Sequence, residues 1–397
     1  MKRITELITK APRLLSLRAA SFLLAILAAA PLLLPAALAA TAAPAKATAP
    51  GKADWEQKWD AVQAGARKEG ALSIWTTSTS QLRAALVPPL KEKFGINLDM
   101  LTGNQGELLQ KITAERHAGK QTVDMTLFSP VGYLDYLKPH GMITPLADQV
   151  LLPDVKDDKK WLNGKFPMFD KDGTVVALTS AYFSYLLINT QLVKEGEIKS
   201  YRDLLNPKWK GKIVMYDPTA GPSAAETFVN YVVPRFMGAK EGEKFLRDLT
   251  KQDLAFLRDR RLQVEWVARG KYPIAIAPAG SVVDELAAAG APITYVRPEE
   301  GGLLAVAASC LAIMKDAPHP QAAAVFLNWV LTEEGQRIFS AGFPAPPRRL
   351  GVNYTGKDRF SIVRPGDKTI EADEAFYLSG KKTTHWAKDI FGPVIAK

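Results

Sequence analysis

Apolar and polar residues follow two spacings along this chain. Short apolar runs are typical of buried strands, and apolar residues repeated every three to four positions are typical of amphipathic helices. In the first third of the chain, three predicted strands each lead into a helix. The strands cover residues 71–75, 96–101 and 123–128, and the helices after them cover 81–94, 107–118 and 131–137, preceded by a helix at 54–68. This succession predicts a largely parallel sheet with right-handed crossovers.

A second α/β region begins with the long apolar run 175–188, which we expect to be one strand passing from one lobe to another. Predicted strands follow at 213–216, 272–277 and 293–297, with helices at 224–233, 242–257, 263–269 and 282–289. The run 303–314 is expected to return to the first lobe, before a helix at 318–331 that 333–339 continues. The predicted fold is therefore α/β, with two doubly wound lobes joined by two crossing strands that form a hinge around a ligand cleft.

The predicted domain boundaries follow from this order. The first lobe comprises 54–179 and, together with the C-terminal tail, 299–397, and the second lobe, 180–298, is inserted between them. Residues 1–40 are predicted to be a signal peptide, because a basic leader and an apolar run end in small residues. Residues 41–53, rich in Ala, Pro, Thr and Lys, are expected to be a flexible linker. An uncleaved membrane anchor is the alternative. We expect an exported, soluble, periplasmic protein.

Loops of small and polar residues connect several predicted strands to helices. In an open α/β sheet the ligand lies beyond the carboxyl ends of the strands, and free N–H groups at helix starts bind anions. The candidate ligand-binding residues of the first lobe are Thr76, Thr77, Ser78, Thr79, Gly103, Asn104, Gln105 and Ser129. Those of the second lobe are Thr219, Ala220, Gly221, Ser223, Gly280 and Ser281, and the crossing run adds Ser180 and Tyr182. Ordinary helix capping is the alternative role for such loops.

The segment 203–213, Asp-Leu-Leu-Asn-Pro-Lys-Trp-Lys-Gly-Lys-Ile, is the most distinctive motif of the chain. It resembles the extracellular solute-binding proteins of ABC importers, with the type II periplasmic fold, in the branch that includes the ferric-ion-binding proteins. The resemblance extends over most of the chain, with support from Gly270 and 272–277, from 323–331 with Glu334-Gly335-Gln336, and from Phe343-Pro344. It implies that a small-molecule solute is captured between two lobes and delivered to an inner-membrane ABC permease.

The resemblance also bears on the ligand. In ferric members a pair of adjacent tyrosines follows the strand that is 272–277 here, and Fe(III) needs anionic oxygen donors. This chain has Ala279-Gly280-Ser281 at that place, and none of its four histidines lies in a candidate loop. We therefore expect no metal ligands and no cofactor.

By comparison with the family, the turn that contains Arg260 and Arg261 lies near the ligand, although a solvated basic turn is the alternative. Arginine suits a carboxylate, phosphate or phosphonate. The expected ligand is therefore a small anionic organic solute, and ferric iron or an iron chelate is the alternative.

Other functional classes find less support in the residues. The net charge of +10 includes five positive charges of the leader, and the rest is scattered without the basic stripe of a nucleic-acid-binding protein. Cys310 lies in an apolar run and is expected to be a buried structural thiol. The sequence contains no nucleophile-elbow, zinc-protease or phosphate-loop motif that would indicate an enzyme. We expect a monomer without enzymatic activity. A sensor subunit that presents its ligand to a membrane receptor is an alternative to an importer component.

Overall fold

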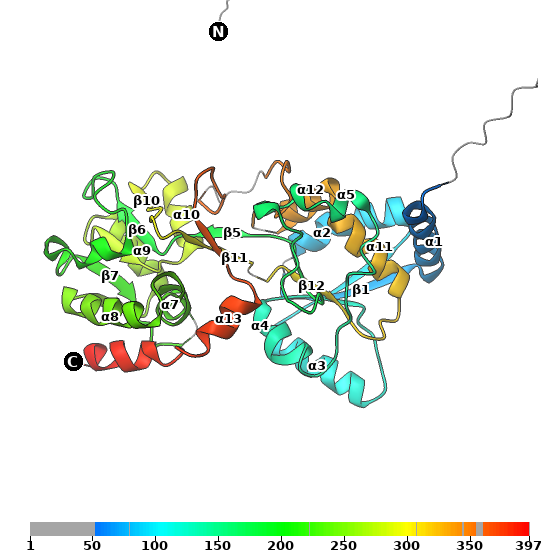
Figure 1. Ribbon diagram of the computed structural model, residues 1–397, viewed down its shortest axis with the longest axis horizontal. Coiled ribbons are helices and arrows are strands. Elements are labelled where there is room, and N and C mark those ends of the chain that lie inside the picture. Colours follow the sequence, from blue (N-terminus) through cyan, green and yellow to red (C-terminus); the bar gives the residue numbers. More distant parts are fainter. Residues whose placement is uncertain are drawn as a thin grey trace, which may run out of the picture. The chain divides into compact units, whose positions relative to one another are not determined.

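The computed structural model describes residues 52–396 apart from 79, 222, 307, 344 and 355–359. The predicted signal peptide and residues 41–51 of the predicted linker lie outside the described residues. No helix within the described ranges is both long and apolar enough to cross a membrane. Figure 1 gives the order of the helices and strands.

The first sheet has the strand order β2-β1-β3-β12-β4. Its strands β1 (Ala71–Thr76), β2 (Asn97–Thr102) and β3 (Met125–Phe128) are parallel, as the sequence predicted. Strand β12 (Cys310–Ile313) runs antiparallel to β3 and to β4 (Val176–Ala177). We call this sheet and its covering helices the first lobe.

The helices of the first lobe are amphipathic. Helix α2 (Ser80–Phe94) buries Leu82, Leu86, Leu90 and Phe94, which recur every fourth residue and so share one face. Helix α1 packs on α11, and α12 packs on α2. The helices are α1 (Asp54–Glu69), α3 (Gln105–His117), α4 (Pro130–Gly132) continued by the π-helix η1 (Tyr133–Leu137), α5 (Pro153–Lys156), α11 (Pro320–Val330) and α12 (Glu333–Gly342), with 3-10 turns η2 (Asp158–Lys160) and η3 (Leu162–Gly164).

The second sheet has the order β10-β6-β9-β7-β8. Strand β7 (Ile213–Tyr216) is parallel to β8 (Ala255–Leu257) and β9 (Ile274–Ile276), whereas β6 (Leu186–Asn189) is antiparallel to β9 and β10 (Ile293–Tyr295). With its helices it forms the second lobe. These are α6 (Ala224–Thr227), the π-helix η6 (Phe228–Val232), α7 (Val233–Met237), α8 (Ala239–Leu249), α9 (Arg260–Ala268) and α10 (Gly280–Ala288), with 3-10 turns η4 (Tyr201–Leu205), η5 (Pro207–Trp209) and η7 (Thr250–Gln252).

The predicted single helix 242–257 is wrong. Helix α8 ends at Leu249, and the chain then turns through Asp253, whose φ of 50° lies in the left-handed region. Residues 255–257 form β8 beside β7. The short apolar run 254–257 fits either a strand or the end of a helix, and its pairing with β7 decides between them.

A third, crossing sheet has the order β13-β11-β5. Strand β5 (Ala181–Phe183) is antiparallel to β11 (Gly302–Ala305), so the two predicted crossings exist. However, 175–188 is not one strand, because it divides into β4, β5 and β6 in three different sheets, and 303–314 divides into β11 and β12. Gly302 permits the close pairing, since a Cβ there would lie 2.3 Å from the Tyr182 ring. Strand β13 (Thr369–Glu371), parallel to β11, was not predicted.

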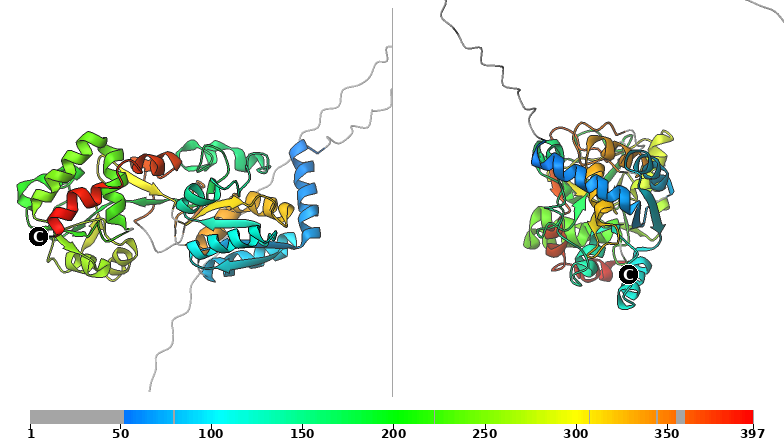
Figure 2. Two further views of the ribbon diagram at one scale, coloured as in Figure 1. Left: turned by 90° about the horizontal axis from the view of Figure 1, so that it is seen from below. Right: turned by 90° about the vertical axis from the view of Figure 1, so that its right-hand side faces the viewer.

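The C-terminal segment was predicted only as a tail that follows the second part of the first lobe. It forms α13 (Glu374–Gly380), the π-helix η8 (Ala387–Phe391) and α14 (Gly392–Ile395). Phe376, Trp386 and Phe391 pack in the core of the second lobe. Both views show this red segment beside the green helices of the second lobe (Figures 1 and 2). The apolar spacing indicated an amphipathic helix but could not indicate which sheet it covers. The other lobe boundaries stay predictions.

Candidate functional site

The loops after β1, β2 and β3 lie together at one edge of the first sheet. The strand register aligns Thr76 with Thr102 and with Leu127, so the three carboxyl ends are level. Adjacent strands lie about 4.8 Å apart, which makes the residues after them neighbours. This edge, which we call the first edge, brings together the predicted candidates Thr76–Ser78, Gly103–Gln105 and Ser129, while Thr79 lies outside the described residues.

Several polar groups of the first edge bind one another. Gln105 Oε1 accepts hydrogen bonds from the backbone N–H of Ser129 at 2.8 Å and from its hydroxyl at 3.0 Å. Asn104 caps α3 by accepting from the N–H of Gly106 at 2.9 Å. Asn104 therefore has the capping role that was the alternative for these loops, and Gln105 ties two loops together.

Ser78 differs from these groups. The N–H of Ser78 donates to Thr76 Oγ1 at 3.0 Å, and both residues are buried. The hydroxyl oxygen of Ser78 is buried and has no hydrogen-bond partner among the described residues. A buried hydroxyl without a partner is costly, so this group has an unused capacity to bind a ligand or a water molecule.

The loops after β7, β8 and β9 form a corresponding second edge. Tyr216 is in register with Leu257, and Met215 with Ile276. This edge brings together the predicted candidates Thr219–Gly221, Ser223 and Gly280–Ser281, of which Ser223 caps α6 by accepting from the N–H of Glu226 at 3.1 Å. Gly280 begins α10, and Ser281 is exposed. Ala277, directly after β9, has a left-handed φ of 53° that is unusual for a residue other than glycine.

A buried carboxylate organises the second edge. Asp217 Oδ1 accepts from the N–H of Thr219 at 2.8 Å and from its hydroxyl at 2.6 Å, and Oδ2 accepts from Arg258 Nε at 2.9 Å. Burial alone would raise the pKa of Asp217, but these hydrogen bonds outweigh it and hold the pKa below its usual value. The Arg258 side chain is 73% exposed, and no further hydrogen bond from its guanidinium is found within the described ranges. Its terminal NH₂ groups can therefore bind an anion.

The two arginines proposed from the sequence have other partners. Arg261 donates to both oxygens of Glu285, at 2.9 and 2.7 Å, and to Glu265 at 3.0 Å. The guanidinium of Arg260 lies 5.2 Å from the centre of the Tyr216 ring. Arg258, which lies in the same basic turn, keeps terminal donors that have no partner among the described residues. The run Arg258-Asp-Arg-Arg indicated a basic turn, but which side chain stays free depends on Asp217 and Glu285, which are distant in the sequence.

The crossing strands contribute Arg348, an arginine that sequence reasoning missed. Arg348 is 4% exposed and donates from Nη1 to Ser180 Oγ at 2.6 Å and from Nη2 to Glu371 Oε1 at 2.7 Å. Its Nε is buried without a partner in the part of the chain that the structure describes. The next residue, Arg349, pairs with Asp154 in the first lobe. Successive side chains of an extended segment point to opposite sides, which explains why Arg348 and Arg349 have different partners.

Tyr182 lies beneath a cation rather than beside a second tyrosine. The Arg297 guanidinium is 4.3 Å from the centre of its ring, and burial raises the pKa of Tyr182 to about 12. Together with Arg297 and Asp367 it lines a hollow of about 260 Å³. No group of three or more His, Cys, Asp or Glu residues able to hold a metal occurs among the described residues.

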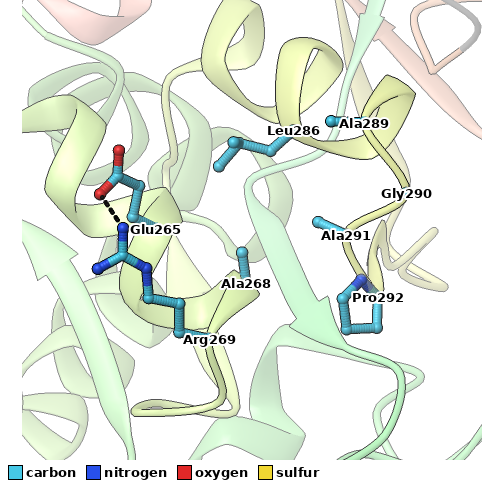
Figure 3. Close-up of a pocket in the computed structure, with 8 residues that line it drawn as sticks. All are labelled: Glu265, Ala268, Arg269, Leu286, Ala289, Gly290, Ala291 and Pro292. Atoms are coloured by element: carbon cyan, nitrogen blue, oxygen red, sulfur yellow. Dashed lines mark hydrogen bonds and ion pairs between the residues drawn. The ribbon is translucent and has the colours of Figure 1, made fainter.

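Figure 3 shows another hollow, of about 370 Å³. It is lined by the C-terminal ends of α9 and α10, whose N-terminal ends belong to the second edge. Figure 3 shows Glu265 paired with Arg269 at its rim. No residue predicted to bind a ligand lines this hollow, so it adds nothing to the candidate site.

Comparisons with known proteins agree with this architecture. The family model of bacterial extracellular solute-binding proteins matches residues 85–359. Iron uptake protein A1 of Synechocystis sp. is 22% identical over 271 residues, which are 65% of this chain and 70% of that protein.

Solved structures of low sequence identity share the fold. The Trichodesmium protein IdiA (FutA), in complex with iron and citrate, has a TM-score of 0.64 and 19% identity, over 82% of this chain and 100% of that chain. AfuA from Actinobacillus pleuropneumoniae, with exogenous fructose-6-phosphate bound, has a TM-score of 0.55 and 18% identity, over 81% of this chain and 98% of that chain. These likenesses confirm the predicted type II periplasmic-binding fold with two lobes.

Proposed function

Because the chain belongs to the family of bacterial extracellular solute-binding proteins, we propose that it is the periplasmic binding component of an ABC importer. Its ligand is a small anionic organic solute of the carboxylate, phosphonate or phosphate type. The solute binds between the first and second edges and stabilises the closed arrangement of the lobes. The protein delivers it to an inner-membrane permease and has no enzymatic activity.

The observation that carries the anionic ligand is the Asp217–Arg258 pair. Asp217 holds the Nε side of the guanidinium, which leaves the two terminal NH₂ groups for an acceptor. A planar pair of donors suits two oxygens of one carboxylate or phosphoryl group. Because Asp217 is buried and anchored to Thr219, Arg258 is oriented before the ligand arrives and loses less conformational freedom on binding.

The first edge supplies neutral groups for the rest of the solute. The Ser78 hydroxyl, which has no partner in the described part of the chain, and the polar groups of Thr77 and Ser129 belong to adjacent loops. The N-terminus of α2 adds a favourable electrostatic field for an anion. In this proposal the solute first binds these neutral groups, and Arg258 then reaches it as the lobes close.

An iron chelate is the second candidate, and it is favoured by the Trichodesmium neighbour that holds iron with citrate. Direct Fe(III) coordination would require several anionic oxygen ligands, and at the second edge the place of the family's tyrosine pair is taken by Ala279–Ser281. A citrate complex would instead present carboxylates to Arg258. This variant of the proposal needs no metal ligand from the protein.

A thermal-shift screen tests the proposal, because a ligand that binds the native state alone raises its stability, by about 2.7 kcal/mol at 100 times the Kd. The panel contains carboxylates, phosphonates, sugar phosphates, polyamines, Fe(III), citrate and Fe(III)-citrate. We expect a shift with one anionic class and none with polyamines. A shift with uncomplexed Fe(III) alone would overturn the organic-anion proposal, and a shift with Fe(III)-citrate but not citrate would select the chelate.

A further inference from the structure

The C-terminal segment contacts both lobes and the crossing sheet. We define residues 369–396, which comprise β13, α13, η8 and α14, as the C-terminal strap. Its first part, β13, pairs with β11. Its helix α13 contacts both lobes, the first through Glu374 and the second through Phe376, and the residues after α13 contact mainly the second lobe. The strap is therefore a third connection between the lobes, in addition to β5 and β11.

The attachment of the strap to the second lobe is apolar and buried. Phe376, Trp386, Ile390 and Phe391 belong to the core of that lobe and are at most 5% exposed. Gly380 lies so close to Tyr231 that a Cβ would come within 1.9 Å of the ring. Burial of this kind is strong and insensitive to salt.

Asn230 adds a polar anchor to this attachment. It donates from Nδ2 to the carbonyl of Thr384 at 3.0 Å, and its Oδ1 accepts from the N–H of Ala387 at 3.0 Å. The hydroxyl of Thr383 donates to the Asn230 carbonyl. Asn230 lies in the π-helix η6 and is buried, so the strap is fixed to the second lobe by both packing and hydrogen bonds.

The attachment to the first lobe is mainly ionic. Lys138, directly after the π-helix η1, donates to Glu374 Oε1 at 2.7 Å and lies 2.8 Å from Asp170 Oδ2 and 3.0 Å from Asp172 Oδ2. Glu374 Oε2 accepts from the N–H of Lys171 at 3.0 Å. A second pair, Lys381 with Asp135 at 2.7 Å, is about half exposed.

One ring contact supplements these ion pairs. Tyr377 packs against Phe169 of the first lobe, with ring centres 6.1 Å apart, and against Tyr231 of the second lobe at 6.4 Å. The first-lobe end of the strap thus buries one aromatic side chain, whereas the second-lobe end buries four large apolar ones. The weaker, ionic end is the one that can yield when the lobes move.

We propose that the C-terminal strap is a latch, anchored permanently on the second lobe and attached to the first lobe through Glu374 and Lys381, that restrains hinge motion before any solute binds. When these ion pairs are released, the lobes sample a wider range of separations. Because the apparent Kd depends on the population that is able to close, the latch sets the solute affinity without touching the solute.

The test uses the full chain without solute, so its outcome is independent of the solute identity. Spin labels on Lys120→Cys in the first lobe and Lys240→Cys in the second, both exposed, report the distribution of interlobe distances by pulsed electron resonance. We expect Glu374→Ala combined with Lys381→Ala to broaden this distribution. The control is Glu334→Ala, which breaks the Lys93–Glu334 pair within the first lobe and should leave the distribution unchanged.

A distance distribution of the double variant that matches the control would overturn the proposal. If the double variant does not fold, the same distances are measured in the wild type and in Lys381→Ala, each with and without added salt. The Debye length falls from about 10 Å at 0.1 M to about 3 Å at 1 M salt, so the exposed Lys381–Asp135 pair is screened. We expect added salt to broaden the wild-type distribution and not that of Lys381→Ala. Equal responses of the two proteins to salt would contradict the latch.

Discussion

The two edges use polar groups in different ways. At the first edge, neutral groups bind one another, as Gln105 binds Ser129, and the Ser78 hydroxyl has no partner among the described residues. At the second edge, the buried carboxylate of Asp217 orders a cation and a hydroxyl. The first edge can therefore hold uncharged parts of a solute with little electrostatic discrimination, whereas the second edge selects for negative charge. Substitutions at each edge should have effects of different size and kind.

The largest effect is expected from Asp217→Ala. It removes the acceptor of three hydrogen bonds at a buried position, so the free energy of unfolding should fall by about 2–3 kcal/mol. Anion binding should also be lost, because Arg258 is no longer oriented. Chemical denaturation and titration calorimetry measure both. Asp248→Ala is the control, because this partly exposed carboxylate pairs with Lys244 and Lys251 on the surface and should change stability much less. Equal losses in the two variants would contradict the role of Asp217.

The pH dependence of stability should report the same carboxylate. The pKa of Asp217 is lowered in the folded protein, so its contribution is fully present above the unfolded value of about 3.9 and is lost as the pH falls through the folded pKa. This contribution is measured as the difference in the free energy of unfolding between the wild type and Asp217→Asn, from neutral pH to pH 3. The stability difference should shrink below about pH 4, and a constant difference would contradict the assignment.

Arg258→Ala should weaken anion binding while sparing the fold. Hydrogen bonds to charged groups contribute about 1.5–3 kcal/mol, so we expect the Kd to rise at least about tenfold. Because the side chain is largely exposed, the thermal midpoint without ligand should change little. Arg258→Lys keeps the charge but loses the planar pair of donors. Its Kd should lie between those of the wild type and Arg258→Ala. An unchanged Kd in Arg258→Ala would place the anion elsewhere.

Gln105→Ala tests the first edge and should have a smaller effect on solute binding than Arg258→Ala. The two hydrogen bonds to Ser129 disappear, and each contributes about 0.5–1.5 kcal/mol. We expect a modest loss of stability and a rise of the Kd that does not vary with salt. The salt dependence of the Kd distinguishes the two edges, because only Arg258→Ala should make the Kd less sensitive to salt. A salt-sensitive loss in Gln105→Ala would contradict the comparison.

Arg261→Ala should have the smallest effect on binding. Its guanidinium already donates to Glu285 and Glu265 at the protein surface, and such solvent-screened pairs contribute little to stability. We expect the same Kd as the wild type by calorimetry. A tenfold loss would show that Arg261 leaves Glu285 when the ligand binds.

The sequence predicted the parts of the fold that depend on local order. The strand–loop–helix units around β1, β2 and β3 were predicted because each strand, its polar loop and its helix are adjacent in the chain. The failures concern partners distant in the sequence. Residues 175–188 contribute to three sheets, and 255–257 pair with β7, which no local pattern specifies.

The same limit applies to the candidate site. Loop positions follow from the strand order, so the sequence could propose Thr219 and Ser129 as neighbours of other polar loops. The pairing of side chains does not follow from it. From the sequence alone, the Arg261 guanidinium could face the ligand. In the fold it donates two hydrogen bonds to the Glu285 carboxylate. Arg348, in an extended segment, becomes a buried cation only because Ser180 and Glu371 pack around it.

The most direct test of the proposed function is a calorimetric titration of the purified protein and of Arg258→Ala with the anion that gives the largest shift in the thermal screen. The account predicts binding of one solute per chain, weakened by salt, and a Kd at least about tenfold higher in Arg258→Ala. Wild-type affinity in Arg258→Ala, or heat of binding with uncomplexed Fe(III) and with no organic anion, would contradict it.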